Sequence, residues 1–147
     1  MSFAAVGLHQ PKSRINVGAA LRAVGCYGAS FLATTGYRYR KSPTDTQREV
    51  RRTPLIQVND LHEVIPYDCV PVAVEIAENS QLLPNYKHPK RAFYIFGPED
   101  GGVPTEIQRW CRDIITIPTD YCMNLAATVN VVLYDRLAKS WEGWKDD

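Results

Sequence analysis

The sequence predicts an α/β protein in which helices flank a parallel β-sheet. Apolar runs alternate along the chain with helix-forming segments, as expected for parallel strands joined by helices. The run at 69–76, CVPVAVEI, is apolar and β-branched, which is typical of a buried strand. The sequence contains no repeats, low-complexity tracts or linkers, so its 147 residues are predicted to form one domain.

Strands and helices are expected to alternate from the N-terminus onward. Strands are predicted at 3–8, 30–35, 69–76, 91–97 and 113–118. The first helix lies within 16–29, where Asn16 is a candidate N-cap and the alanines favour helix. Further helices are predicted at 44–51, 104–111 and 125–141, and the stretch 79–90 is expected to be a surface connection. The last helix repeats apolar residues every three or four positions, which indicates a face in the core: Leu125, Val129, Val132, Leu133 and Leu137.

Composition and charge exclude several classes of protein. The net charge of +1 is too small for a polycation that binds nucleic acid through bulk charge. No apolar run reaches the 18 or more residues of a membrane span, and the N-terminus does not resemble a signal peptide, so a cytoplasmic protein with no membrane partner is expected. The four cysteines form no C-x-x-C pair and have no histidine at zinc spacing, which predicts reduced, mostly buried thiols and no metal site: Cys26, Cys69, Cys111 and Cys122.

Residues 16–22 have the spacing N-x-G-x-x-x-R, formed by Asn16, Gly18 and Arg22. On a helix, Gly18 and Arg22 share a face, so the small residue leaves room for a ligand to approach the guanidinium. Taken alone, the pattern is more often a cap, a packing glycine and a solvated arginine.

Residues 95–104, IFGPEDGGVP, follow the aliphatic end of a predicted strand. Pro98 cannot continue the strand, and the glycines permit close backbone approach. Pro104 suits the first turn of a helix. A bare backbone loop at the end of a strand is where α/β proteins often hold a ligand, although short glycine turns are also common.

A third junction, IPTDYCMNLAA at 117–127, leads from a strand into the last helix. Asn124 stands at the start of that helix and can act as its N-cap. Each of the three junctions could have a purely structural role by itself. Structural roles alone do not explain why all three occur together and in this order.

The three motifs together resemble those of the SpoU/TrmH-type branch of the SPOUT superfamily of RNA methyltransferases. The resemblance rests on N-x-G-x-x-x-R, on FGPEDGGV, and on Ile117-Pro118 followed by Met123-Asn124, and it covers nearly the whole chain. Two features depart from the family pattern: Cys122 replaces a serine, and the loop after Pro118 is shorter than in many relatives.

The resemblance implies a C-terminal deep trefoil knot, although general rules of topology argue against knots. It also implies that S-adenosylmethionine binds in the knot, held by backbone from three loops, with S-adenosylhomocysteine as the product. The expected cofactor-binding residues are Val74, Glu75, Gly97, Pro98, Glu99, Gly101, Gly102, Ile117, Cys122, Met123 and Leu125.

The implied reaction is methylation of a ribose 2′-hydroxyl, with Arg22, Asn16 and Asn124 as the catalytic residues. Family accounts often make the arginine a base, but a guanidinium is a very poor base. Polarising the hydroxyl and gripping a neighbouring phosphate are easier tasks for Arg22, and the two asparagines would orient it and the ribose.

RNA would need a basic face, and residues 38–52 carry an excess of positive charge, with Tyr37 and Tyr39 interleaved as candidate stacking residues. A solvated charged loop is the alternative. Lys12 and Arg14 precede the first motif. The expected RNA-binding residues are Lys12, Arg14, Arg38, Arg40, Lys41, Arg48, Arg51 and Arg52. The resemblance further implies a homodimer, to which Trp141 and Trp144 could contribute apolar anchors.

The expected substrate is tRNA, because the chain resembles the minimal single-domain members, several of which modify tRNA. The same chemistry on ribosomal RNA remains an alternative, as does a non-catalytic RNA-binding module that retains the fold. A dinucleotide-binding oxidoreductase is disfavoured because no G-x-G-x-x-G follows the first strand.

Overall fold

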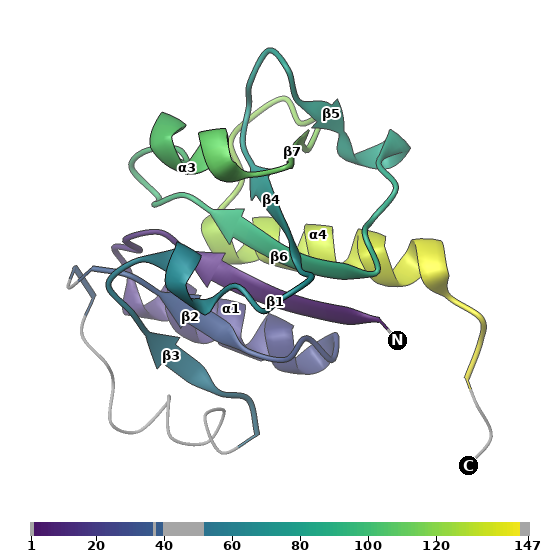
Figure 1. Cartoon of the computed structure of the whole chain (residues 1–147), viewed down its shortest axis with the longest axis horizontal. Coiled ribbons are helices and arrows are strands. Elements are labelled where there is room, and N and C mark those ends of the chain that lie inside the picture. Colours follow the sequence, from purple (N-terminus) through teal and green to yellow (C-terminus); the bar gives the residue numbers. More distant parts are fainter. Residues whose placement is uncertain (1, 37, 40–51, 145–147) are drawn as a thin grey trace.

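The computed structural model describes residues 2–36, 38–39 and 52–144. Within them, seven parallel strands form one sheet in the order β3-β2-β1-β6-β4-β7-β5, and helices lie against it (Figure 1). The strands are β1 (Phe3–Leu8), β2 (Leu32–Thr34), β3 (Leu55–Gln57), β4 (Val70–Val74), β5 (Gln81–Leu82), β6 (Arg91–Phe96) and β7 (Asp113–Thr116). The helices are α1 (Arg14–Cys26), α3 (Thr105–Trp110) and α4 (Leu125–Ser140), with short 3₁₀ turns at Leu61–Val64 and Leu83–Asn85.

This architecture confirms the predicted fold class and all five predicted strands, four of them shortened by one or two residues at an end. The edge strands β3 and β5 were not predicted. They are three and two residues long, too short to show a pattern, and β5 with the following 3₁₀ turn occupies part of the predicted surface connection. The helix predicted at 44–51 lies outside the described residues. The trefoil knot stays a prediction.

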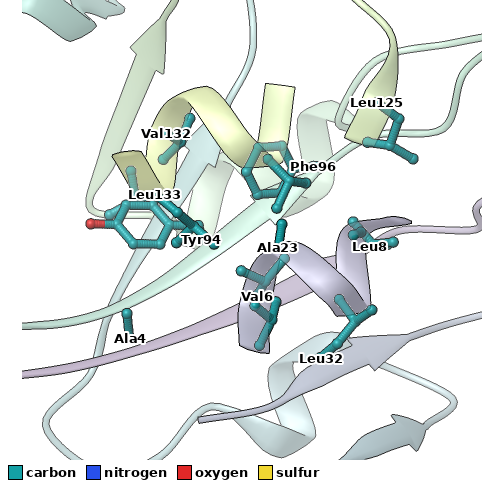
Figure 2. Packing of buried hydrophobic residues seen from close by; sticks show 14 of the residues in the cluster. Ala4, Val6, Leu8, Ala23, Leu32, Tyr94, Phe96, Leu125, Val132 and Leu133 are labelled. Carbon is teal, nitrogen blue, oxygen red and sulfur yellow. The ribbon is translucent and has the colours of Figure 1, made fainter. Parts of the chain in front are cut away.

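Apolar side chains cover both faces of the central strands. Ala4, Val6 and Leu8 of β1 project to one face, where they pack with α1 and α4, and Ala5 projects to the other, beneath the 3₁₀ turn at Leu61–Val64 and α3. Figure 2 shows the first of these layers, in which side chains of β1 and β6 such as Val6 and Phe96 lie beside those of α1 and α4. The predicted apolar face of α4 is confirmed, since four of its five residues are buried: Leu125, Val129, Val132 and Leu133.

The register of the sheet brings several strand ends to one edge. β6 pairs with β1 along its whole length, and Val74 at the end of β4 lies between Phe96 of β6 and Ile115 of β7. Because parallel strands all end at the same edge, the segments that follow β4, β6 and β7 must begin side by side.

Two expectations about single residues were wrong. The N-cap of α1 is Ser13, whose hydroxyl accepts a hydrogen bond from the backbone N–H of Asn16 at 3.4 Å, so Asn16 lies inside the helix and its side chain is available for other contacts. The cysteines are free but not mostly buried, since Cys26 and Cys122 are exposed. No helix among the described residues is long and apolar enough to cross a membrane.

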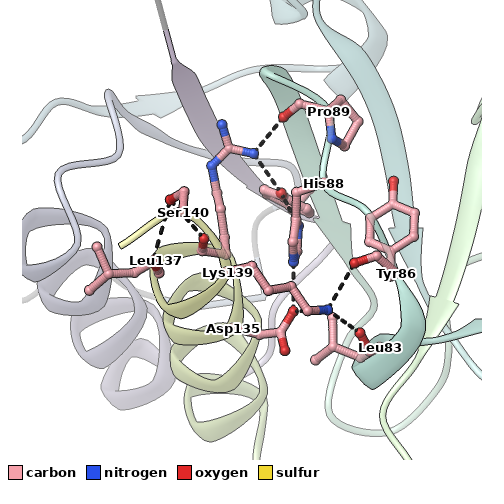
Figure 3. Close-up of polar contacts among 10 residues, drawn as sticks. Leu83, Tyr86, His88, Pro89, Asp135, Leu137, Lys139 and Ser140 are labelled. Carbon is pink, nitrogen blue, oxygen red and sulfur yellow. Dashed lines mark hydrogen bonds and ion pairs between the residues drawn. The ribbon is translucent and has the colours of Figure 1, made fainter. Parts of the chain in front are cut away.

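A partly buried polar cluster holds α4 to the segment before β6 (Figure 3). His88 contacts the hydroxyl of Tyr94 through Nδ1 at 2.6 Å and the carboxylate of Asp135 through Nε2 at 2.7 Å. The guanidinium of Arg136 donates to the Tyr94 oxygen at 3.0 Å, which leaves the Tyr94 hydroxyl proton free for Nδ1 of His88. The lowered pKa of His88 favours a neutral ring with its proton on Nε2, where it is donated to Asp135, which also pairs with Lys139.

Stability should fall in mild acid because of His88. Burial lowers its pKa, against the raising effect of Asp135, while Lys139 and Arg136 lower it further. The unfolded chain therefore takes up this proton first as the pH falls below about 6.5, and the free energy of unfolding declines from there down to the folded pKa by up to about 1.4 kcal/mol per pH unit. Urea unfolding of the wild type and of His88→Gln at about pH 7.5 and about pH 5.5 measures this difference.

His88→Gln should be less stable than the wild type at the higher pH and should lose less stability on acidification. His62→Gln is the matched control, because His62 lies outside the cluster and packs against the ring of Trp110. An equal acid loss in the wild type and His88→Gln would contradict the assignment of a neutral His88.

Candidate functional site

A cavity of about 380 Å³ lies where the segments after β4, β6 and β7 meet. Its wall comes from Val74–Ile76, from the loop that follows Phe96, and from the segment between Thr116 and the first turn of α4. All eleven residues predicted to bind a cofactor line this one cavity: Val74, Glu75, Gly97, Pro98, Glu99, Gly101, Gly102, Ile117, Cys122, Met123 and Leu125.

The loop at 97–102 folds back on itself so closely that a side chain at Gly97 would meet backbone, and one at Gly102 would displace the carboxylate of Glu75. A Cβ on Gly97 would lie 2.4 Å from the carbonyl carbon of Gly102. A Cβ on Gly102 would lie 2.0 Å from the Oε2 atom of Glu75. Any side chain at either position would displace backbone or a carboxylate, so the glycines give the cavity its backbone wall.

Glu75, just after β4, braces the same loop. Its Oε2 accepts a hydrogen bond from the backbone N–H of Val103 at 2.6 Å, and its Oε1 accepts one from Ile76 at 2.8 Å. The carboxylate therefore connects the end of β4 to the residue that leads into α3.

Glu99 connects the glycine loop to the start of α1. Its carboxylate accepts hydrogen bonds from the backbone N–H groups of Lys12 at 2.7 Å and Ser13 at 3.4 Å, and from Nδ2 of Asn16 at 3.2 Å. Partial burial raises the pKa of Glu99, but these donors and its own backbone N–H outweigh it, so the pKa lies below its ordinary value. Glu99 is thus a stable anion at neutral pH.

Asn16 in turn binds Asn124, so the three sequence motifs meet. The Oδ1 atom of Asn16 accepts from Nδ2 of Asn124 at 2.9 Å. Asn124 caps α4 as predicted, because its Oδ1 accepts from the backbone N–H groups of Ala126 at 2.8 Å and Ala127 at 3.3 Å. Each amide has its oxygen and nitrogen fixed by its partners, and the chain of hydrogen bonds runs in one direction, from Asn124 through Asn16 to Glu99.

Arg22 lies on α1 but outside this chain of hydrogen bonds. Its side chain is exposed, and among the described residues it forms no hydrogen bond or ion pair. One turn earlier, nothing lies within 4 Å of the position that a Cβ on Gly18 would occupy. The predicted open space beside the guanidinium is therefore present.

The sequence matches the family model described as the SpoU rRNA Methylase family over residues 4–134. This match includes both asparagines, Arg22 and the whole cavity wall. The chain belongs to the SpoU rRNA methylase family. No curated protein matches the sequence.

Solved structures share the fold of this SpoU family member. The SpoU methyltransferase AviRb from Streptomyces viridochromogenes, in complex with AdoMet, is 19% identical with a TM-score of 0.84, and the match covers 97% of this chain and 60% of that one. An AdoMet-bound rRNA methyltransferase from Sinorhizobium meliloti is 20% identical with a TM-score of 0.80, covering 95% and 57%. A structure described as giving insights into the 2-OH methylation of C/U34 on tRNA is 21% identical with a TM-score of 0.79, covering 94% and 96%. The chain spans about three fifths of the length of the first two.

The predicted RNA-binding residues are only partly within the described part of this SpoU family member. Lys12, Arg14 and Arg52 are exposed. Arg38 forms a bidentate ion pair with Asp100 of the glycine loop, at 3.1 and 2.5 Å. Arg40, Lys41, Arg48 and Arg51, with Tyr37, lie outside the described residues.

The expectation that Tyr39 stacks on bases was wrong. Its side chain is 7% exposed and its hydroxyl contacts Thr34 at 2.5 Å, so the ring belongs to the core. Sequence reasoning had also missed Thr116 and Thr128, which line the cavity. Thr128 could have been found, because it follows Asn124 by one helical turn and donates to the Asn124 carbonyl at 2.9 Å.

Proposed function

We propose that this chain is an S-adenosylmethionine-dependent RNA methyltransferase that methylates a ribose 2′-hydroxyl in tRNA. The observation that carries the proposal is the cavity, whose wall is formed by two of the three family motifs and bonded to the third through Glu99. The AdoMet bound to two similar structures supports the cofactor, and the structure concerned with tRNA 2-OH methylation supports the reaction and substrate.

The residues present suit this cofactor. The glycine loop offers backbone groups without side chains in the way, as adenine and ribose recognition requires, and apolar walls come from Ile117, Met123 and Leu125. S-adenosylmethionine supplies a methyl group on a sulfonium sulfur. The chain must hold that ligand, orient the ribose and assist loss of the hydroxyl proton.

Arg22 is the residue proposed to act on the ribose. Its exposed guanidinium stays charged and can bind a phosphate bidentately while polarising the neighbouring hydroxyl. Asn16 lies within α1 and Asn124 caps α4, and the hydrogen bonds that join Asn124, Asn16 and Glu99 keep the helix that carries Arg22 in place.

A second copy of the chain is proposed to cover the outer faces of α1 and α4. Ile15 is 77% exposed on α1 and Tyr134 is 59% exposed on α4, and Tyr134 contacts Tyr27 at the end of α1 with ring centroids 6.4 Å apart. Arg22 lies on the same exposed side of α1 as Ile15, at helical spacing of seven. A homodimer would therefore bury apolar surface close to Arg22, and sedimentation of the wild type as a monomer at micromolar concentration would contradict this.

The function is tested by mapping 2′-O-methylated riboses in total RNA from cells with and without the gene. We expect a single class of tRNA position to lose its methyl group, and purified protein with S-adenosylmethionine to restore it. Loss of a ribosomal RNA methyl group instead would reassign the substrate. The enzymatic proposal would be contradicted if ribose methylation were the same in tRNA and ribosomal RNA from both kinds of cell and the purified protein methylated neither RNA.

Substitutions of Arg22 test the mechanism. Arg22→Ala should reduce methyl transfer by at least about a hundredfold, because the charge that stabilises the reacting oxygen is lost. S-adenosylmethionine affinity should stay unchanged, since Arg22 does not line the cavity. Arg22→Lys keeps the charge but not the planar fork, so it should remain severely impaired if binding is bidentate.

Arg14→Ala is the matched control, because Arg14 is an exposed arginine at the start of the same helix. It should weaken RNA binding without reducing the rate at saturating RNA. Turnover by Arg22→Ala at the wild-type rate would show that Arg22 is only a surface residue of α1.

A further inference from the structure

The cavity is lined by acids but not by bases. Glu75 and Glu99 are its charged residues, and no lysine, arginine or histidine from the described part of the chain lines it. The rest of the wall is apolar or carries hydroxyl, thiol or backbone groups.

Neutral donors hold both carboxylates. Glu75 accepts from the backbone N–H groups of Ile76 and Val103. Glu99 accepts from two backbone N–H groups and the amide of Asn16. Neither acid forms an ion pair within the described ranges, whereas Asp100 in the same loop is neutralised by Arg38. The hydrogen-bonding needs of the two acids are met. Glu99 also lies within electrostatic reach of Arg38, whereas Glu75 has no charged partner among the ion pairs of the described ranges.

The two acids differ in where they lie. Glu99 is exposed, and its oxygens contact the start of α1. Glu75 is half-buried at the end of β4, the strand between β6 and β7 in the sheet. Its Oε2 atom packs against Gly102, as the 2.0 Å distance to a Cβ placed there shows. An uncompensated charge in a partly desolvated site acts strongly on a bound ion, so Glu75 should dominate the electrostatics of the cavity.

We propose that Glu75 determines specificity for the charge at the ligand's sulfur: its carboxylate favours a cationic sulfonium ligand over the neutral thioether that remains after methyl transfer. This inference rests on the proposed function, which places S-adenosylmethionine in the cavity. S-adenosylmethionine and S-adenosylhomocysteine carry the same adenosine and the same amino acid group. The protein can therefore distinguish them only by the methyl group and the positive charge at sulfur. The charge lost in the reaction would weaken retention of the product and so favour its exchange for fresh cofactor.

The test is calorimetric titration of the full chain with S-adenosylmethionine and with S-adenosylhomocysteine, for the wild type and Glu75→Gln. The quantity of interest is the ratio of the two dissociation constants. Glutamine can accept only one of the two backbone N–H groups, so bracing of the loop also weakens, but this affects both ligands alike. Loss of the charge should shift the ratio against S-adenosylmethionine by about tenfold.

Glu78→Gln is the matched control, an exposed glutamate three residues further on that does not line the cavity, and it should leave the ratio unchanged. Equal weakening of the binding of both ligands by Glu75→Gln would overturn the proposal and leave Glu75 as a brace only.

If Glu75→Gln does not fold, the wild type decides: salt should weaken S-adenosylmethionine binding more than S-adenosylhomocysteine binding, and equal salt dependence would overturn the proposal. Failure of the wild type to bind either ligand would instead contradict the proposed function.

Discussion

The arrangement of the site depends on the hydrogen bonds that the carboxylate of Glu99 accepts. This carboxylate joins the loop after β6 to the start of α1, which lies more than eighty residues earlier in the chain. Through Asn16 the same contact reaches Asn124 and hence the start of α4. Sheet pairing fixes where β6, β4 and β7 end, but it does not fix the helices that follow other strands. Hydrogen bonds to a charged acceptor do this with directional precision that apolar packing lacks.

Glu75 has a similar task on the other side of the cavity. It holds Val103 to the end of β4 and packs against Gly102, so the glycine loop is tied down on both sides. The loop has few side chains of its own to pack, and its shape therefore comes from two carboxylates that accept backbone or amide N–H groups. The same two acids are the charged residues of the cavity wall, so the bracing of the loop and the ligand preference that we propose would share a physical origin.

Much of the fold and of the site could be predicted from the sequence, wherever a feature depends on residues that are close together along the chain. Five of the seven strands were visible as apolar runs, and the N-cap role of Asn124 follows from its place before a helical pattern. The eleven cavity residues came from the family resemblance, which encodes contacts between segments far apart in sequence. The role of Asn16 was not predictable locally, because a cap and a long-range partner of Glu99 have the same appearance in sequence. Tyr39 was misassigned because its basic neighbours indicate a surface, whereas the chain after β2 folds the ring back onto Thr34.

A double-mutant cycle between Glu99 and Asn124 tests the central claim most directly. The two side chains do not bond to each other and communicate only through Asn16 among the contacts described. Free energies of urea unfolding for Glu99→Gln, Asn124→Ala and the double variant should show a coupling of at least about 0.5 kcal/mol. The control cycle pairs Glu99→Gln with Asn130→Ala, whose amide bonds within α4 to the Ala126 carbonyl, and it should be additive. Additivity in both cycles would contradict the claim that one chain of hydrogen bonds joins the three motifs.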